Sequence, residues 1–191
     1  YDSDWDSLFS HPPLPKYVFD ELGFEPGQLE ALSRLRFSES GKKVEGKRYD
    51  AFRDRESTIL KLKGSQHRDG AQLANPLGGE ITDPICLSWA TIPSPESLKL
   101  PPSQAYLDAD RLSFPLAIRP WREGDGFRPL GMKGKKKISD FLVDEKIPLA
   151  TKDQVYVLIS EDKIAWVMGH RISEDFKVTS STKRVIHFRM L

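Results

Sequence analysis

Six basic side chains between residues 122 and 137 are of the types that bind phosphate. They are Arg122, Arg128, Lys133, Lys135, Lys136 and Lys137. Guanidinium groups hold phosphate oxygens through paired hydrogen bonds, whereas ammonium groups act as point charges. Glycines at positions 124, 131 and 134 would let a ligand approach the backbone closely. The other interpretation is a solvated run of surface lysines, and this stretch alone favours neither.

A short helix is predicted directly after the lysines. Ile138, Phe141 and Leu142 recur at the i, i+3, i+4 spacing of one apolar helix face. Pro148 ends this helix or lies just past its end. Lysines are unfavourable at a helix N-terminus, which carries partial positive charge, unless an anion binds there. The sequence therefore predicts a phosphate site where the lysines meet the helix.

Several nearby side chains could either do chemistry or stabilise the fold. Trp121 and Phe127 could stack on an exposed base, but we expect both to pack in the core. We expect Asp125 to orient Arg122 or to cap the loop. Asp108 and Asp110 could be catalytic carboxylates. We instead expect each to bond to a turn, because no partner acid or metal-ligand set lies nearby.

Metal, nucleotide and disulfide chemistry is not indicated by the sequence. The four histidines, His11, His67, His170 and His187, lack the spacing of metal ligands, and His170 is expected to be structural. The chain has no glycine-rich ATP loop of the Walker type. Cys86 lies in an apolar run and is expected to be a buried small hydrophobe. A single cysteine fits a reducing, cytoplasmic location.

Charge is distributed unevenly along the 191 residues, although the net charge is only +1. Residues 1–110 hold 13 Lys and Arg against 18 Asp and Glu, a balance of −5, and residues 111–191 hold 16 against 10, a balance of +6. An anionic partner is therefore expected to bind the second part. No long apolar run is present, so no segment is expected to span a membrane. Because the chain begins at Tyr1, we expect it to be a piece of a longer protein.

The fold is predicted to be α+β, with a short helical start and a β-rich C-terminal domain. Residues 1–15 are expected to be a linker or the end of an upstream domain. Residues 16–105 are expected to form a helical pair and small strands, and residues 106–191 the C-terminal domain. Strands are predicted at residues 42–45, 48–53, 57–63, 80–92, 155–160, 164–168 and 185–190.

Several motifs in the chain resemble the C-terminal region of bacterial tRNA(Ile)-lysidine synthetase. They are YLDADRL (106–112), PLAIRPWREGDGFRPLGMKGKKKISDFLVDEKIPL (115–149), IAWVMGHRI (164–172) and FKVT (176–179). The upstream segments ELGFEPGQLEAL and SGKKVEGKRYDAFRDR resemble the region that precedes this domain in longer members. Lys152 stands where many members have arginine, which puts a bidentate contact there in question.

The resemblance implies a division of labour within a longer ligase. In the family, an N-terminal domain with an SGG.DS signature uses ATP to join lysine to C2 of the wobble cytidine of tRNA(Ile), and this chain lacks that signature. The C-terminal part is implied to hold the acceptor stem, to need no cofactor and to be non-catalytic alone. Its implied partners are tRNA(Ile) with a CAU anticodon and its own catalytic domain. Its implied fold is the one shared with a domain of the phenylalanyl-tRNA synthetase β-chain.

Two other functions stay open from the sequence. The chain could be a docking module that closes on its own catalytic domain or forms a homodimer, with the acidic half against a basic half. It could also be an editing-like hydrolytic domain. The second is disfavoured because no nucleophile and base pair is visible.

Overall fold

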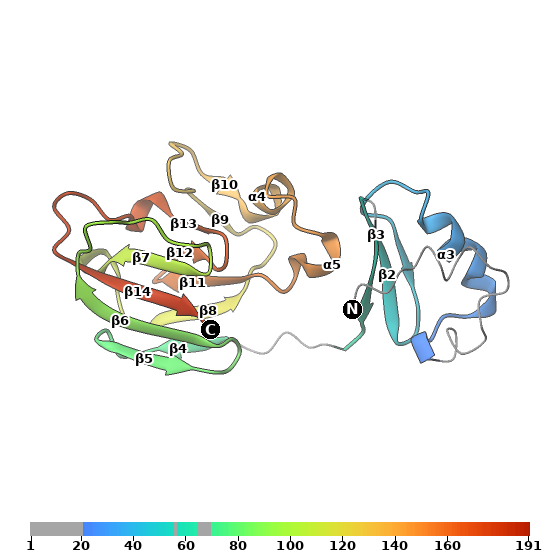
Figure 1. Cartoon of the computed structure of the whole chain (residues 1–191), viewed down its shortest axis with the longest axis horizontal. Helices are drawn as coiled ribbons and strands as arrows, with labels where there is room; N and C mark the ends of the chain where they lie inside the picture. The colour runs from blue at the N-terminus through green and yellow to red at the C-terminus, as the bar shows by residue number, and fades with distance from the viewer. Residues whose placement is uncertain (1–20, 56, 65–69) are drawn as a thin grey trace. The chain divides into compact units, whose positions relative to one another are not determined.

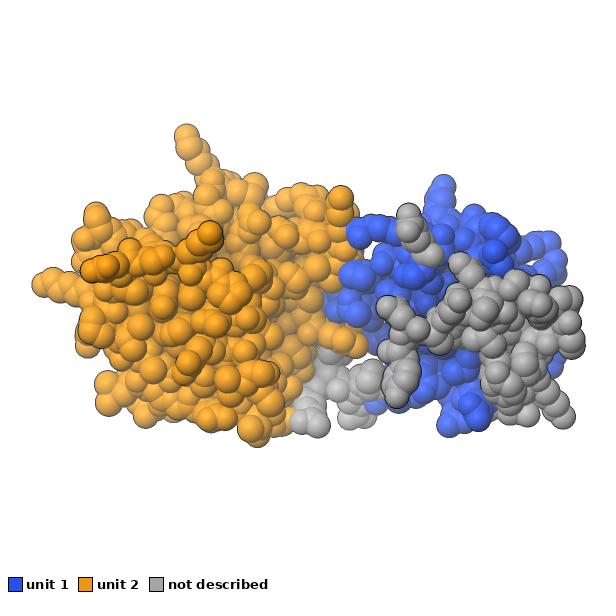
Figure 2. Space-filling view, viewed as in Figure 1, with its two compact units in different colours: residues 1–66, 148–152 blue, residues 67–147, 153–191 orange. Residues whose placement is uncertain are grey.

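The chain divides into two compact units (Figures 1 and 2). The computed structural model describes residues 21–55, 57–64 and 70–191. Unit 1 comprises residues 1–66 with 148–152, and unit 2 comprises residues 67–147 with 153–191. The linker expected at residues 1–15 lies outside the described residues, as does most of the first predicted helix.

Unit 1 packs a short helical segment against a three-stranded sheet. The helical segment is η1 (Pro26–Gln28) followed by α3 (Leu29–Leu35). The antiparallel sheet has the order β1-β2-β3, with bounds Lys43–Glu45, Tyr49–Asp54 and Ser57–Leu62. Leu32 and Leu35 on α3 are buried with Phe24 and Ala51. The helix and the three strands predicted for this part of the sequence are confirmed.

Two antiparallel sheets form the body of unit 2. The five-stranded sheet has the order β13-β12-β11-β8-β4, and the four-stranded sheet the order β5-β6-β14-β7. The first sheet consists of β4 (Ala71–Leu73), β8 (Leu116–Pro120), β11 (Tyr156–Ser160), β12 (Lys163–Val167) and β13 (Arg171–Ile172). The second consists of β5 (Gly78–Ile81), β6 (Leu87–Pro93), β7 (Gln104–Asp108) and β14 (Arg184–Met190). The fold is therefore rich in β-structure with few short helices, as predicted.

The remaining elements of unit 2 are short. They are η2 (Ala109–Arg111), the two-stranded ladder of β9 (Gly126–Phe127) and β10 (Lys136–Lys137), α4 (Ile138–Asp144) and η3 (Glu174–Phe176). One further helix, α5 (Leu149–Lys152), is grouped with unit 1.

The core of unit 2 lies on both faces of β11. Leu158 packs in one cluster with Leu107 and Phe188 from the four-stranded sheet. Its neighbours Val157 and Ile159 pack in a second cluster, which includes α4. Adjacent side chains of a strand point to opposite faces, so β11 is covered on both sides. This explains the apolar run that marks it in the sequence, and it places α4 on a packed sheet.

The structure differs from three expectations. Residues 71–93 belong to unit 2, because β4 pairs with β8 and β6 pairs with β14, so the division does not fall at residue 105. The strand predicted over residues 80–92 is two strands, β5 and β6, interrupted at Asp83-Pro84 because proline offers no amide to a ladder. Cys86 lies in this interruption and is exposed, so the prediction of a buried cysteine was wrong.

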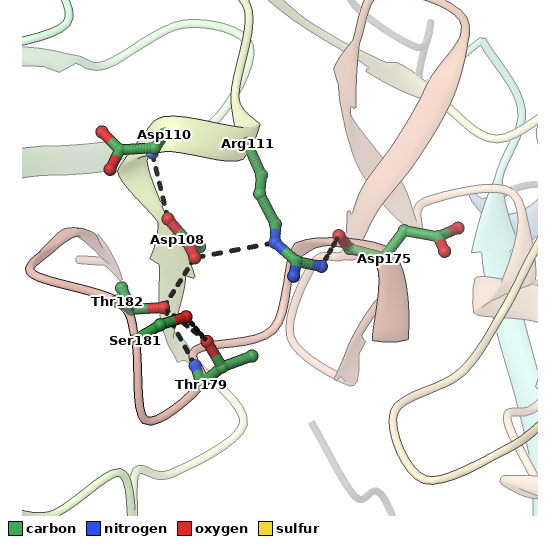
Figure 3. A network of polar contacts seen from close by, with 7 residues as sticks. All are labelled: Asp108, Asp110, Arg111, Asp175, Thr179, Ser181 and Thr182. Atoms are coloured by element: carbon green, nitrogen blue, oxygen red, sulfur yellow. Dashed lines mark hydrogen bonds and ion pairs between the residues drawn. The ribbon is translucent and has the colours of Figure 1, made fainter.

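A polar network fixes the segment before β14 to β7 (Figure 3). The buried Asp108 carboxylate accepts a hydrogen bond from the Thr182 hydroxyl at 2.6 Å and one from the Asp110 amide at 3.0 Å. Arg111 lies 3.6 Å from the same carboxylate. The carboxylate of Asp110 is instead 3.2 Å from Arg184. Asp108 therefore bonds to a turn, as predicted, and both of its oxygens are occupied.

Candidate nucleic-acid interface

The basic stretch forms a hairpin that leads directly into α4 (Figure 1). Lys136 pairs with Phe127 and Lys137 with Gly126 across the β9–β10 ladder. The Phe127 side chain is buried and meets Phe141 of α4 edge to face, with ring centroids 5.1 Å apart. Ile138, Phe141 and Leu142 are all buried, which confirms the predicted apolar face. Phe127 packs in the core, as predicted, and Trp121 is half-buried against the same cluster.

The first part of the loop between β9 and β10 is held to residues 172–175. The Leu130 amide donates to the Ile172 carbonyl at 3.0 Å, and the Gly131 amide donates to the Glu174 carboxylate at 2.9 Å. Arg128 forms an ion pair with Asp175. Gly131 has a φ of +85°, a conformation that glycine adopts at little cost. The loop therefore leaves its anchored section at Gly131, and residues 131–135 are exposed.

Asp125 fixes the start of the hairpin through three hydrogen bonds. Its carboxylate accepts two from the Arg119 guanidinium, at 2.7 and 2.9 Å, and one from the Arg122 amide at 2.7 Å. Burial alone would raise the pKa of Asp125, but these donors outweigh burial and hold that pKa below its usual value. Asp125 thus caps the loop, one of the two expected roles, and binds the backbone of Arg122 rather than its side chain.

The four lysines of the hairpin differ in their surroundings. Lys133, Lys135 and Lys137 are exposed, and within the described part of the chain none of their ammonium groups has a partner. The Lys136 side chain points to the opposite face of the strand from that of Lys137, and it forms an ion pair with Asp144 of α4. Its side chain is only 22% exposed. We call Lys133, Lys135 and Lys137 the lysine row. Arg122 is also exposed, whereas Arg128 is half-buried in its ion pair.

The start of α4 offers less to an anion than the sequence suggested. The helix has seven residues and carries Asp140 in its first turn. The amide of Ile138 already donates to the Asp125 carbonyl at 2.9 Å. Positive charge in this region therefore comes from the lysine row on the hairpin, more than from the helix terminus.

Two residues that follow β12, His170 and Arg171, pack near Phe141 of α4. His170 is half-buried with its ring 6.4 Å from that of Phe141, and burial lowers its pKa despite the nearby Glu145. Arg171 lies 3.1 Å from Glu145 and 6.0 Å from the Phe141 ring. The prediction that His170 is structural fits this packing.

Sequence reasoning missed the residues that hold the hairpin in place. Arg119 is the penultimate residue of β8, and its partner Asp125 lies six residues later, a spacing with no periodic signal. Glu174 and Asp175 lie over 40 residues from the loop that they anchor. No group of three or more His, Cys, Asp or Glu side chains among the described residues could hold a metal. No helix in the described part is long and apolar enough to cross a membrane.

Comparison with known proteins gives consistent matches. Residues 116–188 match the family described as the TilS substrate C-terminal domain. The tRNA(Ile)-lysidine synthase of Parabacteroides distasonis is 35% identical over 181 residues, which are 91% of this chain and 41% of that protein. That of Bacteroides thetaiotaomicron is 30% identical over 191 residues, 97% of this chain and 42% of the relative. The chain thus spans about two fifths of the length of these relatives.

One solved structure matches the fold of this chain, and a second aligns less well. The crystal structure of a TILS C-terminal domain aligns with a TM-score of 0.52 at 20% identity, and covers 63% of this chain and 95% of that one. An N-terminal fragment of the phenylalanyl-tRNA synthetase β-subunit from Pyrococcus horikoshii aligns with a TM-score of 0.44 at 14% identity, over 91% of this chain and 65% of the fragment.

Proposed function

We propose that the chain is the C-terminal region of a tRNA(Ile)-lysidine synthase like those that it matches, and that its unit 2 binds tRNA. The longer protein would be the ATP-dependent ligase that joins lysine to C2 of the wobble cytidine of tRNA(Ile). The present chain would hold the acceptor stem, position the tRNA for a separate catalytic domain, and bind neither ATP nor free lysine.

The exposed lysine row is the observation that carries this proposal. Three ammonium groups stand on one short hairpin, without carboxylate partners among the described residues. A-form RNA is held mainly through phosphate and 2′-hydroxyl contacts, for which lysine and arginine are the usual donors. Asp125 and Glu174 fix the hairpin as far as Gly131, so ordering on RNA binding would be confined to the exposed part of the loop that follows.

The other candidate residues would have secondary roles in the same interface. Arg122 is exposed at the base of the hairpin and would extend the lysine row. Lys136 and Arg128 are each engaged by a carboxylate, so phosphate binding would have to replace an existing ion pair. We therefore propose Lys133, Lys135, Lys137 and Arg122 as the first contacts to phosphate.

A titration of this chain with tRNA tests the proposal directly. Binding of tRNA(Ile) with the CAU anticodon is compared with binding of tRNA(Met) over a series of salt concentrations. Salt-sensitive binding that favours tRNA(Ile) is expected for an acceptor-stem selector. Equal salt-sensitive binding would make the domain a general RNA clamp. No binding to either tRNA would refute the proposal and favour a docking module.

A further inference from the structure

A cavity of about 230 Å³ lies in unit 2 and includes Leu130 of the hairpin loop in its wall. Leu98, Pro101 and Pro102 from the segment between β6 and β7 form further apolar wall. The half-buried Tyr106 contributes aromatic surface, and the buried Trp166 lies behind this part of the wall. Pockets for drug-sized ligands measure about 300–1,000 Å³, so this cavity suits a smaller group.

Polar side chains at the cavity restrict what that group can be. Gln104, His170, Arg171 and Lys177 line it together with the apolar residues. Burial keeps the pKa of His170 below its ordinary value, so at neutral pH its uncharged ring has one donor and one acceptor. The Gln104 amide is held in place by a 2.9 Å hydrogen bond to His187. A wholly apolar occupant would deprive these groups of water without replacing their hydrogen bonds.

A nucleobase has the properties that this lining requires. Its two faces are apolar and stack on aromatic side chains, and its edge carries both hydrogen-bond donors and acceptors. The cations Arg171 and Lys177 would lie near the phosphate that accompanies such a base. Both are paired with carboxylates, Arg171 with Glu145 at 3.1 Å and Lys177 with Glu174. They would therefore contribute less net charge than the lysine row does.

The cavity borders the hairpin loop that carries the lysine row. Leu130 lies three residues before Lys133, a distance that an extended chain spans in at most about 11 Å. The Leu130 amide is bonded to the carbonyl of Ile172, which also lines the cavity. An RNA strand bound by the lysine row would thus lie close to the cavity.

We propose that this cavity receives one unpaired nucleobase of the RNA that the lysine row holds. The base would stack on the half-buried ring of Tyr106, and its edge would be read by His170 and Gln104. The inference rests on the proposed function, because it takes RNA as the partner.

Two matched substitutions on the hairpin loop test this. Leu130 and Met132 are 41% and 42% exposed and lie two residues apart, but only Leu130 lines the cavity. Leu130→Glu and Met132→Glu therefore add the same charge to the same loop. The probes are short RNA duplexes that carry an adenosine, either as a one-nucleotide 3′ overhang or as a single bulge. Each is compared with a duplex that has an abasic ribose at that position.

The ratio of affinities for base-bearing and abasic RNA is the decisive readout. For one of the two probe types, wild type and Met132→Glu should prefer the base-bearing duplex by about tenfold, a typical effect of stacking one base. Leu130→Glu should bind both duplexes equally. A ratio of one in the wild type for both probe types, or an unchanged ratio in Leu130→Glu, would overturn the inference while leaving salt-sensitive RNA binding intact.

Two further results would be distinguishable from these. If no duplex shows salt-sensitive binding, the proposed function fails, and the inference fails with it. A fluorescently labelled proline-rich peptide provides the other comparison. In the contrary case, the wild type binds this peptide and Leu130→Glu does not, while the ratio of affinities for base-bearing and abasic RNA is one. That result would assign the cavity to a protein segment and overturn the inference.

Discussion

Removing the lysine row should weaken RNA binding in a way that depends on salt. The perturbation is the triple variant Lys133→Ala, Lys135→Ala and Lys137→Ala. Removing one ammonium–phosphate interaction should flatten the slope of log K against log[salt] by about 0.7–0.9, so removing all three should flatten it by about 2.1–2.7. Between 1 M and 0.15 M salt this slope change corresponds to about 50- to 170-fold in affinity, with little difference expected at 1 M.

A second triple variant provides the control for net charge. Unit 2 has three other exposed cations at Lys163, Lys183 and Arg189. Replacing these by alanine lowers the net charge by the same amount as the lysine-row variant. The assay is a fluorescence titration of labelled tRNA with each protein at four or more salt concentrations. The control should keep most of the wild-type slope, because only general attraction is reduced.

Thermal unfolding of the same proteins separates binding from folding. The lysine row is exposed and unpaired among the described residues, so its removal should change stability by no more than about 0.5 kcal/mol. The reasoning is refuted if the two triple variants flatten the slope equally. It is also refuted if the lysine-row variant melts far lower than wild type while its slope is unchanged.

Other predictions concern the supports of the hairpin. Asp125→Asn should lower the free energy of unfolding by about 2 kcal/mol in urea at pH 7, because it weakens charge-assisted bonds to Arg119. Since the pKa of Asp125 is lowered in the folded state, this difference should shrink below about pH 4, and a constant difference would contradict the assignment. Gly131→Ala should cost about 1 kcal/mol because of its φ of +85°, whereas Gly134→Ala, with open space around it and no positive φ, should be neutral in thermal melts. Wild type should lose stability below about pH 6.5, because the His170 ring takes up a proton more readily in the unfolded state than in its buried native position. His170→Gln should reduce this loss. The prediction is contradicted if the urea midpoints of the variant and of wild type fall in parallel from pH 7 to pH 5.

Local patterns in the sequence predicted the elements that carry the site. The spacing of Ile138, Phe141 and Leu142 indicated the buried face of α4, and all three are buried. Strands were predicted at residues 155–160 and 164–168, and the structure contains them as β11 and β12, paired with each other between the two core clusters. These features depend on residues close in sequence, so periodicity is enough to find them.

Long-range pairing determines the features that the sequence did not reveal. Lys136 and Lys137 look equivalent in the sequence, but strand alternation turns Lys136 toward Asp144 and leaves Lys137 exposed. The anchoring of the loop by Glu174 depends on a fold that brings together residues 43 positions apart. Cys86 was predicted to be buried from its apolar neighbours, but it lies in the turn that Asp83-Pro84 creates. Apolar neighbours in the sequence do not show whether a residue lies in a buried strand or in an exposed turn.

The position of β14 in its sheet has a consequence for synthesis on the ribosome. β14 follows every other strand in chain order, yet it pairs with both β6 and β7 at the interior of the four-stranded sheet. Until residues 184–190 emerge, β6 and β7 each lack the neighbour that they share, and Leu107 cannot yet pack with Phe188 in the core. From the emergence of residues 104–108 until that of residues 184–190, a nascent chain must therefore carry β6 and β7 without their shared neighbour, a state that is prone to aggregation. Folding of this sheet is then a late, non-local event, in which β14 inserts between β6 and β7.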